Sequence, residues 1–91
     1  MNYSEIYEWI KEYIDAGERA EKSKKFDKVE FFIMYINNRY VIQYDIANMI
    51  LGDFFWEKEY NEENLKTIFE NIIKENIKYC KDGLEYMETL I

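Results

Sequence analysis

Two adjacent asparagines, Asn37 and Asn38, separate two runs of β-branched and aromatic residues, and this feature constrains the fold most strongly. The runs are KVEFFIMYI before the pair and RYVIQYD after it. Because Asn tolerates the positive φ angles of a type I′ turn, the pattern predicts a β-hairpin with a two-residue loop. The facing pairs would be Ile36/Arg39, Tyr35/Tyr40, Ile33/Ile42 and Phe31/Tyr44.

The predicted hairpin has two unequal faces, because side chains alternate along a strand. One face is wholly apolar or aromatic and is expected to pack against helices: Phe31, Ile33, Tyr35, Tyr40, Ile42 and Tyr44. The second face mixes apolar and polar residues: Phe32, Met34, Ile36 and Val41 beside Glu30, Arg39 and Gln43. This second face is too apolar for an ordinary solvated surface, so we expect another strand, a partner or a second protomer to cover it.

Two stretches have the apolar spacing of amphipathic helices. The first carries Ile6, Trp9, Ile10, Tyr13 and Ile14, with Asn2 or Ser4 as the cap and Gly17 as the stop. The second follows Asn61 and ends near Asp82-Gly83, with a stripe of Leu65, Ile68, Phe69, Ile72, Ile73, Asn76, Ile77 and Cys80. Cys80 is interpreted as a small core residue on this stripe, and residues 84–91 as one or two further helical turns.

The segments beside the hairpin are less distinct. Residues 18–28 are polar without a period, which suits a loop or an extension of the first helix. Asp45 is expected to cap a short helix that ends near Gly52. Phe54 and Trp56 alternate as in a third strand, although Phe54 also continues the helical face of Ile46 and Ile50. The sequence therefore predicts a single α+β domain spanning residues 1–91, in the order α-β-β-α-α, with the third strand left open.

The composition excludes several kinds of chemistry. The 91 residues contain no histidine and one cysteine, and the three glycines are isolated. An imidazole base, a histidine metal ligand, an intramolecular disulfide and a phosphate-binding glycine loop are therefore absent. We expect no enzymatic activity, no cofactor and no metal site. No apolar run is long enough for a signal peptide or a membrane span, so a cytoplasmic location without membrane association is expected.

The net charge of −7 is uneven along the chain. Residues 1–21 carry −4, residues 22–45 carry +2, and residues 46–91 carry −5. The basic stretch is confined to Lys22, Lys24, Lys25 and Lys28. Because acidic surfaces repel the phosphate backbone, we expect a basic protein surface as partner and no direct contact with nucleic acid.

The densest acidic group lies between the hairpin and the second helix. It has two interpretations: a solvated surface at a helix start, or a patch that docks on a basic groove and imitates nucleic acid. Neighbouring aromatic residues favour an interface, since Tyr and Trp offer large contact area at small entropic cost. A bias toward A/T-rich codons explains the abundant Tyr equally well. The candidate partner-binding residues are Asp53, Phe55, Trp56, Glu57, Glu59, Tyr60, Glu62 and Glu63.

A short, acidic α+β chain without catalytic machinery resembles, in profile, the small phage-encoded anti-CRISPR and other anti-defence proteins. The resemblance lies in length and composition and includes no motif, so it assigns no residue roles. It implies a phage or mobile-element origin and inhibition of a basic, nucleic-acid-binding defence protein in a bacterial cytoplasm. An immunity protein or antitoxin that neutralises a nuclease is a related alternative. A homo-oligomeric structural domain is a second hypothesis, and an enzyme or small-ligand binder a third.

Overall fold

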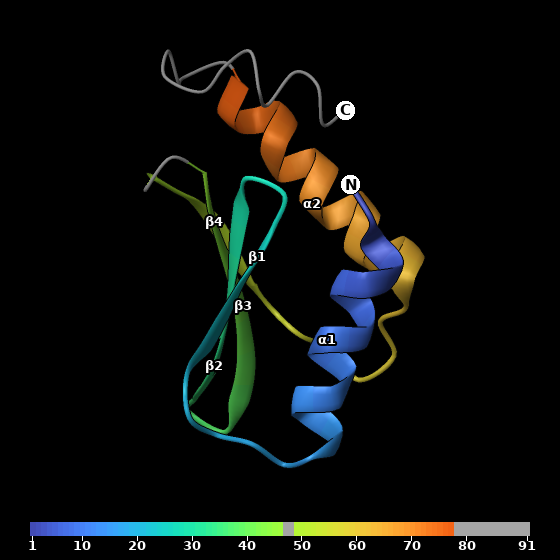
Figure 1. Cartoon of the computed structure of the whole chain (residues 1–91), viewed down its shortest axis with the longest axis vertical. Coiled ribbons are helices and arrows are strands. Elements are labelled where there is room, and N and C mark those ends of the chain that lie inside the picture. Colours follow the sequence, from blue (N-terminus) through green and yellow to red (C-terminus); the bar gives the residue numbers. More distant parts are fainter. Residues whose placement is uncertain (47–48, 78–91) are drawn as a thin grey trace.

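The computed structural model describes residues 1–46 and 49–77 of the chain. The elements are α1 (Tyr3–Asp15), β1 (Lys22–Phe26), β2 (Val29–Ile36), β3 (Arg39–Ile46), β4 (Met49–Phe55) and α2 (Glu62–Ile77). The strands form one antiparallel sheet in the order β1-β2-β3-β4, and both helices lie on the same face of it (Figure 1). The α+β class is therefore confirmed, but the order is α-β-β-β-β-α rather than α-β-β-α-α.

The β2–β3 hairpin has the predicted turn and register. Asn37 and Asn38 have φ angles of 51° and 64°, as a type I′ turn requires. Ile36 faces Arg39, and every predicted pair from Tyr35/Tyr40 to Phe31/Tyr44 is present. Each Asn occupies a conformation that most side chains avoid, so this dipeptide specifies the turn and the turn sets the register.

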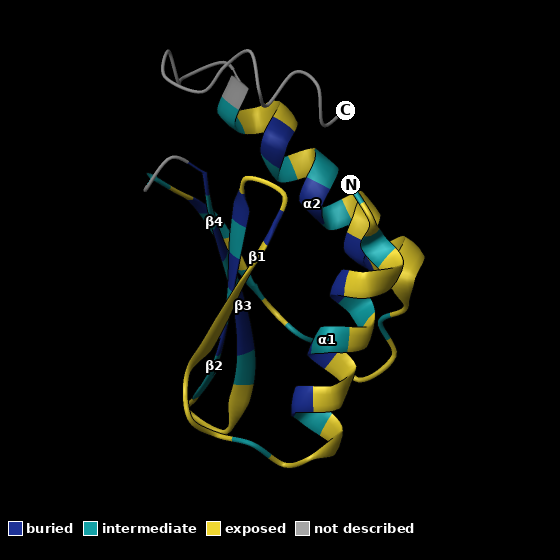
Figure 2. Ribbon diagram, in the orientation of Figure 1, coloured by how far each residue is buried: buried dark blue, intermediate teal, exposed yellow. Residues whose placement is uncertain are grey.

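The core lies between the sheet and the two helices, where the buried positions of both layers face each other (Figure 2). At its centre, the Phe69 ring of α2 lies 5.6 Å from the Phe31 ring and 5.0 Å from the Tyr44 ring. The first hairpin face therefore packs against the helices, as predicted. The fully buried side chains include Ile6, Ile10, Phe31, Ile33, Ile42, Tyr44, Leu65, Phe69 and Ile73.

Asparagine side chains cap the start of both helices. The Asn2 Oδ1 atom accepts a hydrogen bond of 3.2 Å from the Glu5 N–H, so Asn2 rather than Ser4 is the cap of α1. Before α2, Asn61 and Asn64 form a reciprocal pair in which each side chain accepts from the other's N–H, at 2.9 and 3.0 Å. Gly17, with a φ of 67°, follows the end of α1 as predicted.

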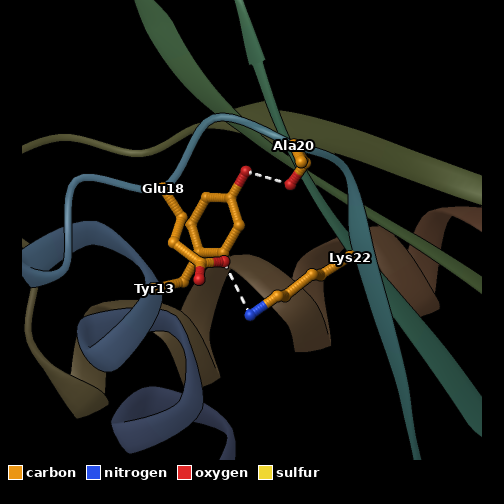
Figure 3. Close-up of polar contacts among 4 residues, drawn as sticks. All are labelled: Tyr13, Glu18, Ala20 and Lys22. Carbon is orange, nitrogen blue, oxygen red and sulfur yellow. Dashed lines mark hydrogen bonds and ion pairs between the residues drawn. The ribbon is translucent and has the colours of Figure 1, made fainter.

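The interpretation of residues 18–28 as a loop or helix extension is wrong for the second half of that segment, which forms β1. Four of the five β1 residues are exposed, so no buried alternation marks the strand in the sequence. Its backbone pairs with β2, and Phe26 at its end enters the core. The connection from α1 is held by the Tyr13 hydroxyl, which donates to the Ala20 carbonyl at 2.6 Å (Figure 3).

The short helix predicted from Asp45 to Gly52 is also wrong, because β3 continues to Ile46 and β4 begins at Met49. The alternative of a further strand through Phe54 is confirmed, but the strand runs over Met49–Phe55 and ends before Trp56. Tyr44 pairs with Gly52 while Asp45 pairs with Ile50, so Leu51 is an extra residue in a β-bulge. The bulge shifts the alternation by one residue, so Ile50 and Phe54 lie on opposite faces of the sheet and not on one helical face. Cys80, Asp82-Gly83 and the predicted turns over 84–91 lie outside the described residues.

Candidate functional site

The eight predicted partner-binding residues do not form one surface. Asp53 and Phe55 lie on the face of the sheet opposite the helices, where they pair with Gln43 and Val41. Glu59 is exposed in the connection between β4 and α2, and Glu62 and Glu63 are exposed in the first turn of α2. The set therefore divides between the two layers of the molecule.

Of the two candidate aromatic anchors, only Phe55 is well exposed, at 47% of its surface. Trp56 packs against the core, with its ring 6.1 Å from Tyr7 of α1 and 5.4 Å from Tyr60. Trp56 thus packs the start of the β4–α2 connection against α1, and Tyr60 packs against Trp56. Neighbours in a strand point to opposite faces, which explains why Phe55 and Trp56 have different environments.

The second hairpin face has no helix or strand over it within residues 1–46 and 49–77, and we call it the open face. Apolar side chains occupy its centre, namely Phe32, Met34, Ile36, Val41 and Phe55. Toward the end of this face that carries the hairpin turn lies a hollow of about 270 Å³ bordered by Ile36, Arg39, Val41, Asp53 and Phe55. The lining of the hollow combines apolar side chains with one guanidinium and one carboxylate.

Arg39 was not among the predicted site residues, yet it organises one end of the open face. Its guanidinium lies 3.8 Å from the centroid of the Phe55 ring, a cation–π geometry. The same group forms an ion pair of 2.9 Å with the Glu57 carboxylate. The predicted register, which places Arg39 on the second hairpin face, is the sequence signal that points to this position.

The helical layer, which comprises α1, α2 and the connection before α2, is strongly acidic on its outer surface. Its exposed acids are Glu5, Glu8, Glu12, Asp15, Glu59, Glu62, Glu63 and Glu75, against the exposed lysines Lys11, Lys58, Lys66 and Lys74. Glu62 and Glu63 also interact favourably with the positive end of the α2 dipole. The acidic half of the predicted site is therefore part of a larger negative surface.

A hollow of about 290 Å³ lies at the side of the helical layer, between α1 and β1. We call it the Trp9 hollow; it is lined by Asn2, Ser4, Glu5, Glu8, Trp9, Glu12 and Lys24. Trp9 is partly buried, with its ring 5.7 Å from Phe26 of β1. Three carboxylates beside an indole can receive a cationic side chain with an aliphatic stem. The sequence signal is the spacing of Glu5, Glu8 and Glu12 around Trp9 on one helical face.

The strongest pKa shifts belong to Tyr44, which is fully buried in the core, and to Tyr3, which is partly buried against it. Burial, and then the negative charge of Glu70, raise the pKa of Tyr3 to about 12. Burial, and then the charge of Asp53, raise the pKa of Tyr44 as well. Among the described residues, the Tyr44 hydroxyl has no hydrogen-bond partner. Both therefore stay protonated at neutral pH, and they are structural groups rather than acid–base groups.

The described part of the chain holds no group of three or more Cys, Asp or Glu side chains arranged to bind a metal ion. Neither α1 nor α2 has the length and apolar content needed to cross a membrane. No protein-family model, curated protein sequence or solved structure matches this chain.

Proposed function

We propose that this protein is a small inhibitor that docks its acidic helical layer on a basic, nucleic-acid-binding protein and blocks it by stoichiometric binding. The observation that carries the proposal is the charge of that layer, with eight exposed carboxylates against four exposed lysines. A CRISPR effector of a bacterial host is the target class that the profile of the chain favours. Under this proposal the chain originates from a phage or mobile element.

Electrostatics supports a basic partner in two ways. A groove that binds nucleic acid is lined with Lys and Arg, and carboxylates on a compact surface compete for the same cations. Opposite charges also accelerate the encounter of the two proteins, and the acceleration falls as salt screens the field. Glu59, Glu62 and Glu63, from the predicted site, belong to this surface, whereas Asp53 and Phe55 do not.

The Trp9 hollow gives the proposed interface an anchor. A Lys or Arg side chain of the partner would place its stem on the indole and its charged end between Glu5, Glu8 and Glu12. Interface energy is concentrated at such partly enclosed aromatic positions rather than spread evenly over the contact area. The hollow therefore adds specificity to a docking surface that charge alone would leave nonspecific.

The test uses purified CRISPR effectors and nuclease toxins, with calorimetry for binding and DNA cleavage for inhibition. We expect one-to-one binding to at least one of them, a loss of cleavage at equimolar protein, and an affinity that falls with rising salt. An unrelated acidic protein of equal net charge serves as a control. If cleavage by every member of the panel is unaffected, the proposal fails.

Matched charge reversals locate the interface. Glu8→Lys with Glu12→Lys changes the Trp9 hollow, whereas Glu30→Lys with Asp45→Lys makes the same charge change on the open face. We expect the first pair to weaken binding by at least tenfold and the second pair to have a much smaller effect. Equal losses would indicate a response to net charge alone, against docking by the helical layer.

A further inference from the structure

The sheet ends in two edge strands, and they differ in how they present their backbone. The β1 edge carries Lys22, Lys24 and Lys25, and charged side chains of this kind prevent pairing with another strand. The β4 edge has the sequence MILGDFF, with one charged residue, and Ile50 and Phe55 are 61% and 47% exposed. An apolar edge without lysine is the type that accepts a further strand.

The hydrogen-bond phase shows which β4 groups point away from the sheet. The Trp56 N–H donates to the Tyr40 carbonyl at 2.8 Å, so Trp56 and, two residues earlier, Phe54 direct their backbone groups toward β3. The residues that alternate with them, Asp53 and Phe55, direct their N–H and C=O groups outward, away from β3. Toward the start of β4, the Leu51 carbonyl accepts from the Asn76 side chain at 2.9 Å, so α2 occupies that position. The pairable stretch is therefore short and centred on Phe54.

We propose that the β4 edges of two copies pair antiparallel about a two-fold axis at Phe54, giving one continuous sheet from two four-stranded ones. In this register each Asp53 faces Phe55 of the second copy. An axis at Asp53 would oppose the two Asp53 carboxylates, and an axis at Phe55 would oppose Asp53 and Glu57. Like charges directly opposite each other destabilise strand pairs, so the register centred on Phe54 is favoured.

Charge complementarity supports a second copy as the occupant. The Arg39 guanidinium lies over the Phe55 ring, at 3.8 Å from its centroid. Where Phe55 faces Asp53 of the second copy, Arg39 of each copy comes beside the carboxylate of the other. The two exposed Phe55 rings become diagonal neighbours within reach of aromatic side chains. The β4 edge of one copy thus offers the β4 edge of a second copy backbone hydrogen bonds, an apolar contact through Phe55 and a charge opposite to that of Asp53.

The first test measures mass against concentration by light scattering and sedimentation, together with two substitutions at one position. We expect a mass of twice 11.3 kDa at high protein concentration, which falls to the single-chain value on dilution. Asp53→Pro removes the outward N–H as well as the carboxylate, whereas Asp53→Ala removes the carboxylate alone. We expect Asp53→Pro to raise the dissociation constant at least tenfold above that of Asp53→Ala. A single-chain mass at every concentration, or equal effects of the two variants, overturns the proposal.

The second test reports the register and keeps the proposal falsifiable if Asp53→Pro disrupts β4. Asp53→Cys and Phe55→Cys are prepared separately with Cys80→Ala, so that only the introduced thiols oxidise. The mixture should give much more disulfide-linked dimer than either variant alone, because the introduced thiols face each other only when a position-53 variant pairs with a position-55 variant. A mixture that cross-links no better than the separate variants contradicts the register. The helical layer is not involved, so this inference and the proposed inhibition can fail independently.

Discussion

The two edge strands of the sheet, β1 and β4, both expose backbone groups that could pair with another strand, and they differ in what limits that pairing. β1 is exposed at four of its five positions and enters the core only through Phe26, and its lysines oppose further pairing. β4 has a buried Leu51, a bulge and α2 packed against it, and within residues 1–46 and 49–77 no further strand pairs with the outward backbone groups of Asp53 and Phe55. Lysine side chains therefore oppose strand pairing at the β1 edge. At the β4 edge, packing against α2 opposes it only along the part of the strand that α2 contacts.

The largest expected effect comes from removing the single core contact of β1. Phe26→Ala should lower the free energy of unfolding by about 3–5 kcal/mol, because its ring contacts Trp9 and Phe31 at centroid distances of 5.7 Å. Amide hydrogen exchange in β1 should accelerate more than elsewhere. Leu51→Ala removes the buried side chain of β4 in the same way. In that variant the packing of α2 should keep the amide hydrogen exchange of β4 slow. Urea unfolding and residue-resolved exchange measure both, and uniform acceleration in Phe26→Ala would contradict the single-anchor description of β1.

The packing of α2 on β4 depends on a missing side chain at Gly52. A Cβ atom there would lie 2.9 Å from Cγ2 of Ile72, so Gly52→Ala should destabilise the protein by about 1–3 kcal/mol. Combining Gly52→Ala with Ile72→Ala should cost less than the sum of the two single variants. The control is Gly17→Ala, where nothing lies near and only the φ of 67° opposes the change. Additive values in the double-mutant cycle would contradict direct contact.

Alkaline pH should lower the stability of the protein through two tyrosines, Tyr44 opposite β4 and Tyr3 at the start of α1. The folded-state pKa of Tyr3 is raised from 10.0 to about 12, and that of Tyr44 is raised in the same direction. Above pH 10 the unfolded chain loses these protons first, so the free energy of unfolding falls as pH rises toward 12. The variant Tyr3→Phe/Tyr44→Phe should have a shallower alkaline decline in its urea midpoint. An identical decline in the variant would assign the effect to other groups.

Two tyrosine hydroxyls provide a smaller comparison between the sides of the sheet. On the β4 side, Tyr44 faces Gly52 and its hydroxyl has no partner among the described residues, so Tyr44→Phe should stabilise the protein by about 1 kcal/mol. On the β1 side, Tyr13 donates to the Ala20 carbonyl at 2.6 Å, so Tyr13→Phe should destabilise it by about 1 kcal/mol. Thermal and urea unfolding at neutral pH measure both, and equal signs would refute the distinction.

The smallest effects are expected at the ion pairs beside the two edges. Glu18 pairs with Lys22 at 2.6 Å next to β1, and Glu57 pairs with Arg39 at 2.9 Å next to β4. The side chains of both pairs are about half exposed to solvent, so Glu18→Gln and Glu57→Gln should each cost less than about 1 kcal/mol. Arg39→Lys should cost more than Glu57→Gln, because Lys lacks the planar group that stacks on Phe55. Unfolding in low and high salt separates the Coulombic part from the stacking part.

The candidate site could be predicted from the sequence only in part. The exposed position of Phe55 and the acidic residues near the start of α2 follow from local pattern. The burial of Trp56 does not, because it depends on Tyr7, which is distant in the chain and close only after folding. The Trp9 hollow likewise requires Lys24, and therefore β1, to lie beside α1. A site assembled from separate segments has no signature in any one of them.

The sequence by itself determined the features whose physical cause is local. Asn37-Asn38 specifies its turn through φ, the turn sets the hairpin register, and the apolar stripes with their asparagine caps define α1 and α2. The tertiary structure decided the identity of β1 and β4, the open face and the division of the predicted site. An exposed strand such as β1 has no buried alternation, and a bulge at Leu51 interrupts the alternation of β4. Both become strands because the hairpin beside them offers unpaired backbone groups, and those groups exist only once the hairpin has formed.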